Sequence, residues 1–186
     1  MKKVIFLILF FSSCHFKVEV IKRYQEYFDD STYQIFQTAV NAYQKGKYVL
    51  ADSLFTIAIN KSQSKLSISM PEEFNPYFYR GNNSFELERY KEAISDMEHV
   101  ASDTTSNIHV LLLRTEAFKM LKQYDTSISI CNKLLALKYD SMMILSQRGV
   151  CYYQKGEMVK ACCDLKLSKK MGCDTAFLNK FLTACK

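Results

Sequence analysis

The sequence predicts an all-α protein built from consecutive pairs of helices, and three observations carry this prediction. The chain has only 5 glycines and 2 prolines among 186 residues, and tight β-turns need both residue types. Segments of the chain repeat at an interval of 34 residues. Within a copy, apolar or small residues recur at helical spacing, as at Leu145, Gly149 and Tyr152.

The overall composition is that of a folded domain without a nucleic-acid footprint. A hydrophobic content of 48% with 24% charged residues is ordinary for globular proteins, so we expect no extended disorder. The net charge of +6 is mild, and no run of five lysines or arginines occurs. Binding to nucleic acid needs a clustered basic stripe, so we expect no nucleic-acid partner.

Residues 1–13 are expected to be a signal peptide. Lys2 and Lys3 precede an apolar run over residues 4–11, which is shorter than the about 20 residues needed to span a bilayer. The stretch Phe11-Ser12-Ser13-Cys14 resembles a bacterial lipobox, although Phe11 stands where leucine is usual. The resemblance implies a diacylated (palmitate-type) lipid anchor on Cys14 and a periplasm-facing place in the bacterial cell envelope. A plain secretory signal and a buried N-terminal helix are the alternatives.

Residues 14–31 are expected to form a tether or a short amphipathic helix, with Val20, Tyr24, Tyr27 and Phe28 on one side. Four repeats should then follow at residues 32–65, 74–107, 108–141 and 142–173. Copies two to four align at three kinds of position, with eight extra residues between the first and second copies. These are the arginines Arg80, Arg114 and Arg148; the small residues Gly81, Thr115 and Gly149; and the inter-helix residues Tyr90, Tyr124 and Met158.

This period and pattern resemble the tetratricopeptide repeat, in which each unit is two antiparallel helices. The resemblance implies a right-handed solenoid of about four helix–turn–helix repeats. Gly149 opposite Ala161 allows the two helix axes of one copy to approach closely. The usual tryptophan and closing proline are absent, and Thr115 and Ser127 make the third copy irregular.

Residues 174–186 are expected to form a helix that caps the array. Folding this helix back about Gly172 brings Cys162 and Cys185 to similar heights, which predicts a disulfide between them. Cys163 is a competing partner, and free thiols are the alternative. The spacing of Ala161, Cys162, Asp164, Gly172 and Cys185 also resembles a C-terminal pattern of tetratricopeptide lipoproteins from Bacteroidetes.

Two recurring arginine–aspartate pairs read as structural ion pairs. Arg80 with Asp96 and Arg148 with Asp164 share a separation of 16 residues, one residue on each helix of a copy. The third copy has Ile130 in place of the acid, so a catalytic role for these pairs is not expected.

No phosphate-binding loop, nucleophile elbow or metal-ligand spacing occurs in the sequence, and His15, His99 and His109 have no paired Cys-x₂-Cys beside them. We therefore expect a non-catalytic protein without metal or cofactor, whose partner is a protein or peptide. Tetratricopeptide arrays bind such partners on a concave face lined by their first helices. Helical phase assigns seven residues to that groove: Phe36, Tyr43, Phe78, Asn82, Phe85, Lys119 and Tyr153.

Two other interpretations remain open at this point. Some of the groove aromatics could instead pack against the N-terminal segment 16–28. A thiol-exchange or other envelope enzyme could use Cys162, Cys163 and Cys185, although their spacing lacks the Cys-x-x-Cys of redox sites.

Overall fold

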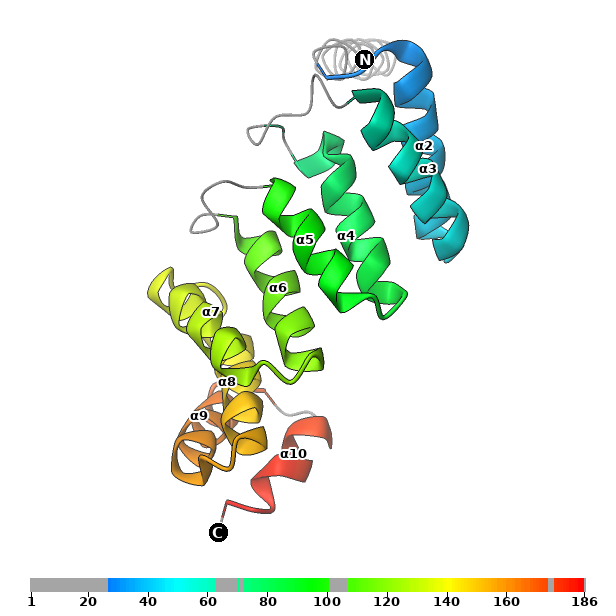
Figure 1. Ribbon diagram of the computed structural model, residues 1–186. Coiled ribbons are helices and arrows are strands. Elements are labelled where there is room, and N and C mark those ends of the chain that lie inside the picture. Colours follow the sequence, from blue (N-terminus) through cyan, green and yellow to red (C-terminus); the bar gives the residue numbers. More distant parts are fainter. Residues whose placement is uncertain (1–26, 63–69, 71, 101–106, 174–175, 186) are drawn as a thin grey trace, which may run out of the picture. The chain divides into compact units, whose positions relative to one another are not determined.

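Every regular element in the described part of the chain is helical. The computed structural model describes residues 27–62, 70, 72–100, 107–173 and 176–185. The α-helices are α2 (Asp30–Gln44), α3 (Tyr48–Ser62), α4 (Pro76–Glu86), α5 (Tyr90–Val100), α6 (Ile108–Met120), α7 (Tyr124–Ala136), α8 (Ser141–Gln154), α9 (Met158–Lys170) and α10 (Ala176–Leu182), with a short 3₁₀ turn at Glu72–Phe74 (Figure 1). None of these helices combines the length and the apolar character needed to cross a bilayer. The expected signal peptide, Cys14 and most of the segment 14–31 lie outside the described residues.

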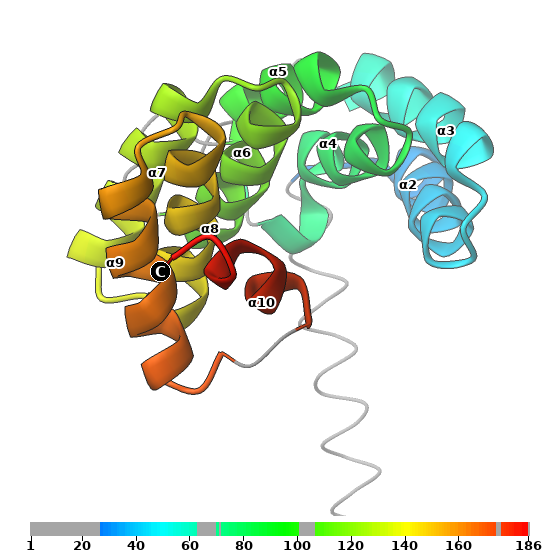
Figure 2. The ribbon, with the colours of Figure 1, turned by 90° about the horizontal axis from the view of Figure 1, so that it is seen from below.

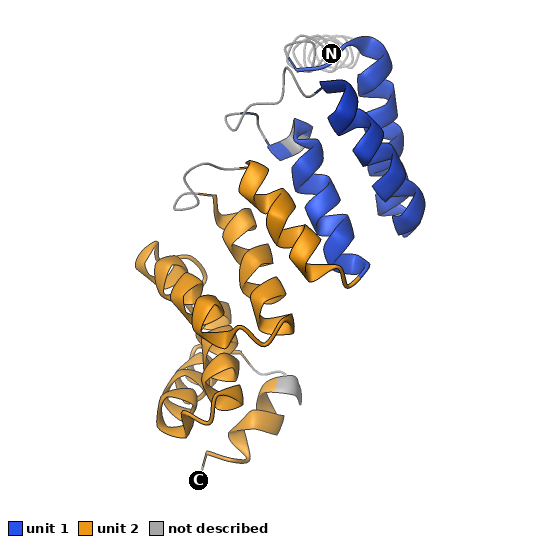
Figure 3. Ribbon diagram, viewed as in Figure 1, with its two compact units in different colours: residues 1–87 blue, residues 88–186 orange. Residues whose placement is uncertain are grey.

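The chain divides into two compact units (Figure 3). The first, residues 1–87, contains α2, α3 and α4, which all pack on one another. The second, residues 88–186, contains α5 to α10, and each of these helices packs against the next one along the chain. The boundary falls in the turn of the second predicted repeat, so its helices α4 and α5 belong to different units. Arg80 and Asp96, a predicted ion pair, are likewise divided between the units.

The first helix of each pair begins with a side-chain cap. Asp29, Asn75, Asn107 and Asp140 each accept a hydrogen bond from a backbone N–H of the first turn. Such caps satisfy donors that the helix itself leaves without a partner. Gln123 and Glu157, which precede the second helices α7 and α9, make no such bond. The second helices instead follow tight turns.

Those turns share one backbone conformation. Gly46, Glu88, Lys122 and Gly156 stand at equivalent places, two residues before the second helix of each pair, and have φ of 69°, 59°, 59° and 80°. This left-handed region costs a residue with a Cβ atom energy that glycine does not lose. The first and fourth copies use glycine there, and the second and third do not.

Small residues line the seam of the third and fourth pairs, between α6 and α7 and between α8 and α9. Gly149 faces Leu165, since a Cβ atom added at Gly149 would lie 2.8 Å from the Leu165 Cγ atom. In the irregular third copy, Thr115 and Ser127 are fully buried, but both hydroxyls have partners. The Ser127 hydroxyl donates to the Thr115 carbonyl oxygen at 3.0 Å, and the Thr115 hydroxyl donates to the Leu111 carbonyl oxygen at 2.8 Å. The irregularity therefore leaves no unsatisfied polar group at these two hydroxyls.

Arg148 joins three helices of the second unit. Its guanidinium donates from Nε and Nη2 to the two carboxylate oxygens of Asp164, at 2.7 and 2.8 Å, which links α8 to α9. Its Nη1 donates to the Asn132 side-chain oxygen on α7 at 2.6 Å. The predicted ion pair between Arg148 and Asp164 is therefore confirmed, and it is bidentate.

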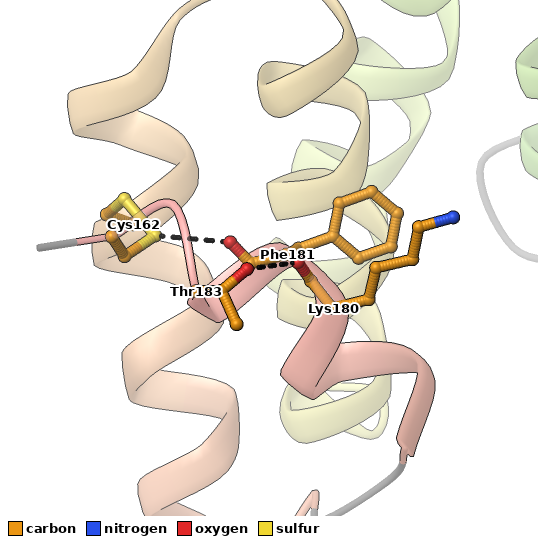
Figure 4. The surroundings of a disulfide bond; sticks show 5 residues. Cys162, Lys180, Phe181 and Thr183 are labelled. Atoms are coloured by element: carbon orange, nitrogen blue, oxygen red, sulfur yellow. Dashed lines mark hydrogen bonds between the residues drawn. A yellow bond between two sulfur atoms is a disulfide. The ribbon is translucent and has the colours of Figure 1, made fainter.

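The helix α10 packs against both α8 and α9 and closes the end of the second unit (Figure 2). Leu178, Phe181 and Cys185 are buried in one cluster with Val150 and Leu165. The structure contains the expected disulfide between Cys162 on α9 and Cys185 after α10, with an S–S distance of 2.06 Å (Figure 4).

Candidate partner-binding site

The candidate site lies on the first helices of the first unit. Tyr43 on α2 and Phe78, Asn82 and Phe85 on α4 are all partly buried, and α2 and α4 pack against each other. The Tyr43 ring lies 5.9 Å from the Tyr48 ring, and burial raises the pKa of the Tyr43 hydroxyl. The site therefore consists of half-covered aromatic side chains on two helices that pack against each other.

The polar member of this set is turned toward its own helix. The Asn82 side-chain amide donates to the Phe78 carbonyl oxygen at 2.8 Å, one helical turn earlier. The Phe78 ring meets Tyr79 edge-to-face, with ring centroids 5.8 Å apart. Internal contacts thus fix the orientation of these side chains before any partner is bound.

Phe36 does not belong to a binding surface, which corrects the prediction from helical phase. Its side chain is fully buried, and its ring stacks on Phe28 at 5.3 Å and meets Tyr79 edge-to-face at 5.5 Å. Phe28 comes from the N-terminal segment and is itself only 2% exposed. The interpretation that this segment covers some of the aromatic residues therefore holds at Phe36.

The two predicted groove residues of the second unit are also engaged. Lys119 forms an ion pair with Glu116 on the preceding turn of α6. Tyr153 on α8 is partly buried, and the Phe181 ring of α10 lies edge-on to it at 5.0 Å. The capping helix thus covers part of the Tyr153 ring. Asn82 and Lys119 belong to different units.

A polar pocket on α2 is a feature that sequence reasoning did not single out. It has a volume of about 580 Å³ and lies along α2 and the turn to α3. Its lining combines the apolar residues Val40, Ala42 and Leu50 with a set of side-chain amides and ammonium groups, which are those of Gln34, Gln37, Asn41, Gln44, Lys45 and Lys47. The sequence signal was available, because these amides recur at intervals of three and four residues, the spacing of one helical face.

The cysteines separate into buried and accessible groups. Cys131 and Cys151 are free and fully buried, and burial raises the pKa of the Cys131 thiol to about 12 and also raises the pKa of the Cys151 thiol. Cys163 is free and exposed, and Cys173 is free and partly buried. The disulfide partner Cys185 is only 8% exposed. Thiol exchange needs an accessible sulfur with thiolate character, which neither buried thiol provides.

In the part of the chain that the structure describes, no group of three or more histidine, cysteine or acidic side chains is arranged to hold a metal ion.

Comparison with solved structures shows the fold of this chain. A tetratricopeptide repeat protein from Parabacteroides merdae superimposes with a TM-score of 0.69 at 18% identity, over 84% of this chain and 59% of that one. MamA from Desulfovibrio magneticus RS-1 gives 0.64 at 14% identity, over 77% and 78% of the two chains. A tetratricopeptide repeat protein from Thermus thermophilus gives 0.50 at 17% identity, over 83% and 98%.

The chain is therefore a tetratricopeptide repeat protein by fold, an all-α helical repeat solenoid. The first of these structures belongs to a Bacteroidetes organism, in keeping with the resemblance that the sequence predicts. This chain spans 59% of the length of that protein. No family model matches the sequence, and no curated protein matches it.

Proposed function

We propose that this chain is a non-catalytic protein–protein interaction scaffold that binds a peptide or partner protein on its first helices, on the concave face of the repeat array. The observation that carries the proposal is the set of half-buried rings of Tyr43, Phe78 and Phe85 on the adjacent helices α2 and α4. Aromatic rings give a partner a large apolar contact at little cost in conformational entropy, and they are enriched at recognition surfaces. Repeat arrays bind through extended surfaces of this kind.

The polar pocket on α2 supports a peptide as the partner. An extended peptide carries backbone N–H and C=O groups that must find hydrogen-bond partners when they lose water. The side-chain amides of Gln37, Asn41 and Gln44 each offer a donor and an acceptor, and Lys45 and Lys47 add donors. These groups can satisfy the backbone of a peptide that lies along α2.

Recognition of a chain-terminal carboxylate is not part of the proposal. Such recognition uses unpaired cationic groups in the groove, and the charge of Lys119 is already balanced by Glu116.

The proposed location is the bacterial cell envelope, with the chain tethered by a lipid on Cys14 and facing the periplasm. The support is the basic and apolar leader of residues 1–13 directly before Cys14. A disulfide between Cys162 and Cys185 fits an oxidising compartment, since disulfides persist there and are rare in the cytosol.

Site-specific photo-crosslinking tests the binding surface. A photoreactive phenylalanine analogue placed at Tyr43 or at Phe85 should give a discrete crosslinked adduct in native membranes. Val49 on α3 is the matched control, because it is 69% exposed but belongs to a second helix. Adducts of the same size and yield from all three positions, or from none of them, would contradict the proposed site.

The anchor is tested separately by intact mass. Protein recovered from native membranes should begin at Cys14 and carry diacylglycerol, and the Cys14→Ala variant should lack this modification. An unmodified full-length chain in the soluble fraction would rule out the lipid anchor and leave the binding surface to be judged by the crosslinking.

A further inference from the structure

The outward side of α9 carries a line of protruding apolar side chains. Val159 is 81% exposed and Leu167 is 47% exposed, and the exposed thiol of Cys163 lies midway between them. The three residues follow each other at intervals of four, so they form one line along the helix. Ala161, Leu165 and Ser168, on the opposite side of α9, are buried. The contacts that hold α9 in the fold are therefore made by the face opposite to this line.

Lysines flank this line, and no free acid accompanies them on α9. Lys160, Lys166 and Lys170 are all exposed. The one acid within α9, Asp164, is bound by Arg148. Glu157, just before the helix, is shared between Lys155 and Lys160, whereas Lys166 and Lys170 have no ion pair within the described residues. We call Val159, Cys163 and Leu167, together with Lys160, Lys166 and Lys170, the α9 stripe.

The repeat itself does not require such a stripe. The equivalent residues of α7, 34 positions earlier, are Asp125, Ser129 and Lys133, and all three are exposed and polar. The helix α7 packs between its neighbours without apolar residues at these places. The equivalent residues of α3 are Val49, Ser53 and Ile57, and both Val49 and Ile57 are exposed as well. The α3 helix has no lysine at the places of Lys160, Lys166 and Lys170, so the combination of protruding apolar residues with lysines is what distinguishes α9.

We propose that the α9 stripe docks on the surface of an anionic lipid bilayer. Its apolar side chains protrude instead of lining a hollow, which suits insertion into a headgroup layer better than capture of a partner's side chains. Long lysine side chains can lie along an apolar surface and place their charge among lipid phosphates. A second copy of the chain is disfavoured, because it would bring two sets of lysines together. This inference goes beyond the proposed function and uses neither the groove nor the lipid anchor.

The thiol of Cys163 allows a local test on the full-length chain. A polarity-sensitive fluorophore is attached to Cys163 in a Cys14→Ser, Cys173→Ser background, in which the remaining free thiols, Cys131 and Cys151, are buried. Vesicles of phosphatidylcholine mixed with phosphatidylglycerol should shift the emission of this probe to the blue. The matched control carries the probe at position 129 on α7, through Ser129→Cys with Cys163→Ser, and its emission should stay that of a probe in water. A tether elsewhere in the chain would act on both probes alike.

Charge variants decide whether the lipid charge is recognised. Each lysine near an anionic surface strengthens binding about fivefold. The double variant Lys166→Gln with Lys170→Gln should therefore lower the ratio of vesicle-bound to free protein, measured with the probe at Cys163, about 25-fold. Lys133→Gln with Lys138→Gln removes the same charge elsewhere in the second unit and should change the ratio less than about twofold.

Four results would overturn the proposal. These are no shift with anionic vesicles, an equal shift of the probe at position 129, an equal shift with phosphatidylcholine alone, and an equal shift with soluble polyglutamate, which would assign the stripe to an acidic protein.

Discussion

At the scale of single residues, two equivalent arginines lie in different environments, because the acid that binds one of them is replaced by an apolar residue in the other repeat. Arg148 is held by both carboxylate oxygens of Asp164. Arg114 occupies the same place one repeat earlier, where the acid is replaced by the buried Ile130. The buried Arg114 Nε has no hydrogen-bond partner within the described residues, and its guanidinium lies over the Phe118 ring at 5.8 Å. A buried polar group without a partner lowers stability, so the two arginines should contribute differently.

Replacing each arginine by methionine tests this difference. Arg148→Met should lower the free energy of unfolding by about 2–3 kcal/mol, because it leaves the Asp164 carboxylate mostly buried without a partner. Arg114→Met should change it by less than about 0.5 kcal/mol, because little hydrogen bonding is lost and the apolar contact with Phe118 is kept. Chemical denaturation of both variants measures the contrast, and equal losses would contradict it.

The cap at Asp29 makes a pH-dependent contribution to stability. The backbone N–H of Thr32, followed by the hydroxyls of Ser31 and Thr32, lowers the pKa of Asp29 from 3.8 to about 2. A lowered folded-state pKa gives stability that is fully present above the unfolded-state value near 3.8 and is lost as the pH falls toward 2. An asparagine side chain at this position would cap the helix without titrating, so the Asp29→Asn variant should show a shallower fall in stability between pH 4 and pH 2. Superimposable pH profiles would contradict this role.

At the scale of elements, the left-handed turn residues offer a comparison between copies. Lys122 and Gly156 hold the same conformation, with φ of 59° and 80°. Lys122→Gly should raise the free energy of unfolding by about 0.5–1 kcal/mol, because glycine avoids the Cβ clash of this region. Gly156→Ala should lower the free energy of unfolding by about 1 kcal/mol, because alanine is strained in this left-handed conformation. No atom lies within 4 Å of the new Cβ atom, so the loss would come from the backbone conformation and not from a clash with a neighbour. Thermal unfolding of both variants shows whether each change raises or lowers the free energy of unfolding. Changes in the same direction would be inconsistent with backbone strain at this position.

The disulfide fixes the last helix to the array. Cys162→Ser with Cys185→Ser should lower the free energy of unfolding by about 3 kcal/mol in the chain-entropy model. The loss should be greatest at α10, which depends on this link and on Phe181 and Leu178 for its packing. Cys163→Ser is the control, because its thiol is exposed and unbridged. Equal effects of the two changes on stability would contradict a stapling role.

The helices themselves followed from local signals in the sequence. Tyr90, Tyr124 and Met158, which the repeat pattern aligns, are the first residues of α5, α7 and α9. The caps of the first helices also have a local signal, because each is an aspartate or asparagine directly before the helix; these are Asp29, Asn75, Asn107 and Asp140. The 34-residue period by itself does not reveal them. Because helix ends are decided by residues a few positions apart, sequence patterns suffice to find them.

At the scale of the whole molecule, prediction from the sequence was weaker, because the candidate site depends on contacts between distant segments. Helical phase placed Phe36 on an open face, but Phe28 from the preceding segment covers it. The same reasoning left Tyr153 open, and Phe181 of the capping helix packs on it. A repeat pattern describes the average copy, so it does not reveal what the ends of the chain add to the first and last copies.

The repeat architecture also predicts how far a local change should spread. In a solenoid each repeat contacts only its neighbours, so stability is lost progressively along the array. Within the second unit, breaking the disulfide should therefore reduce hydrogen-exchange protection most in α10 and α9, less in α8, and least in α6 and α5. Native-state hydrogen exchange resolves this gradient. A uniform loss across α5 to α10 would show instead that the unit opens as one cooperative body.

The burial of Cys131 and Cys151 has a consequence for the order of events during biogenesis. Once α7 and α8 have packed, these two thiols are enclosed and burial raises their pKa. Among the cysteines that the structure describes, an oxidant then meets only those of α9, of the turn after α9 and of the segment after α10. A chain that folds before it is oxidised should therefore form the native Cys162–Cys185 disulfide without competition from Cys131 or Cys151. A chain oxidised first can join Cys131 or Cys151 to Cys162, and such a bridge would hold α7 or α8 away from its place. Timing, as much as redox potential, then sets the yield of correctly paired protein.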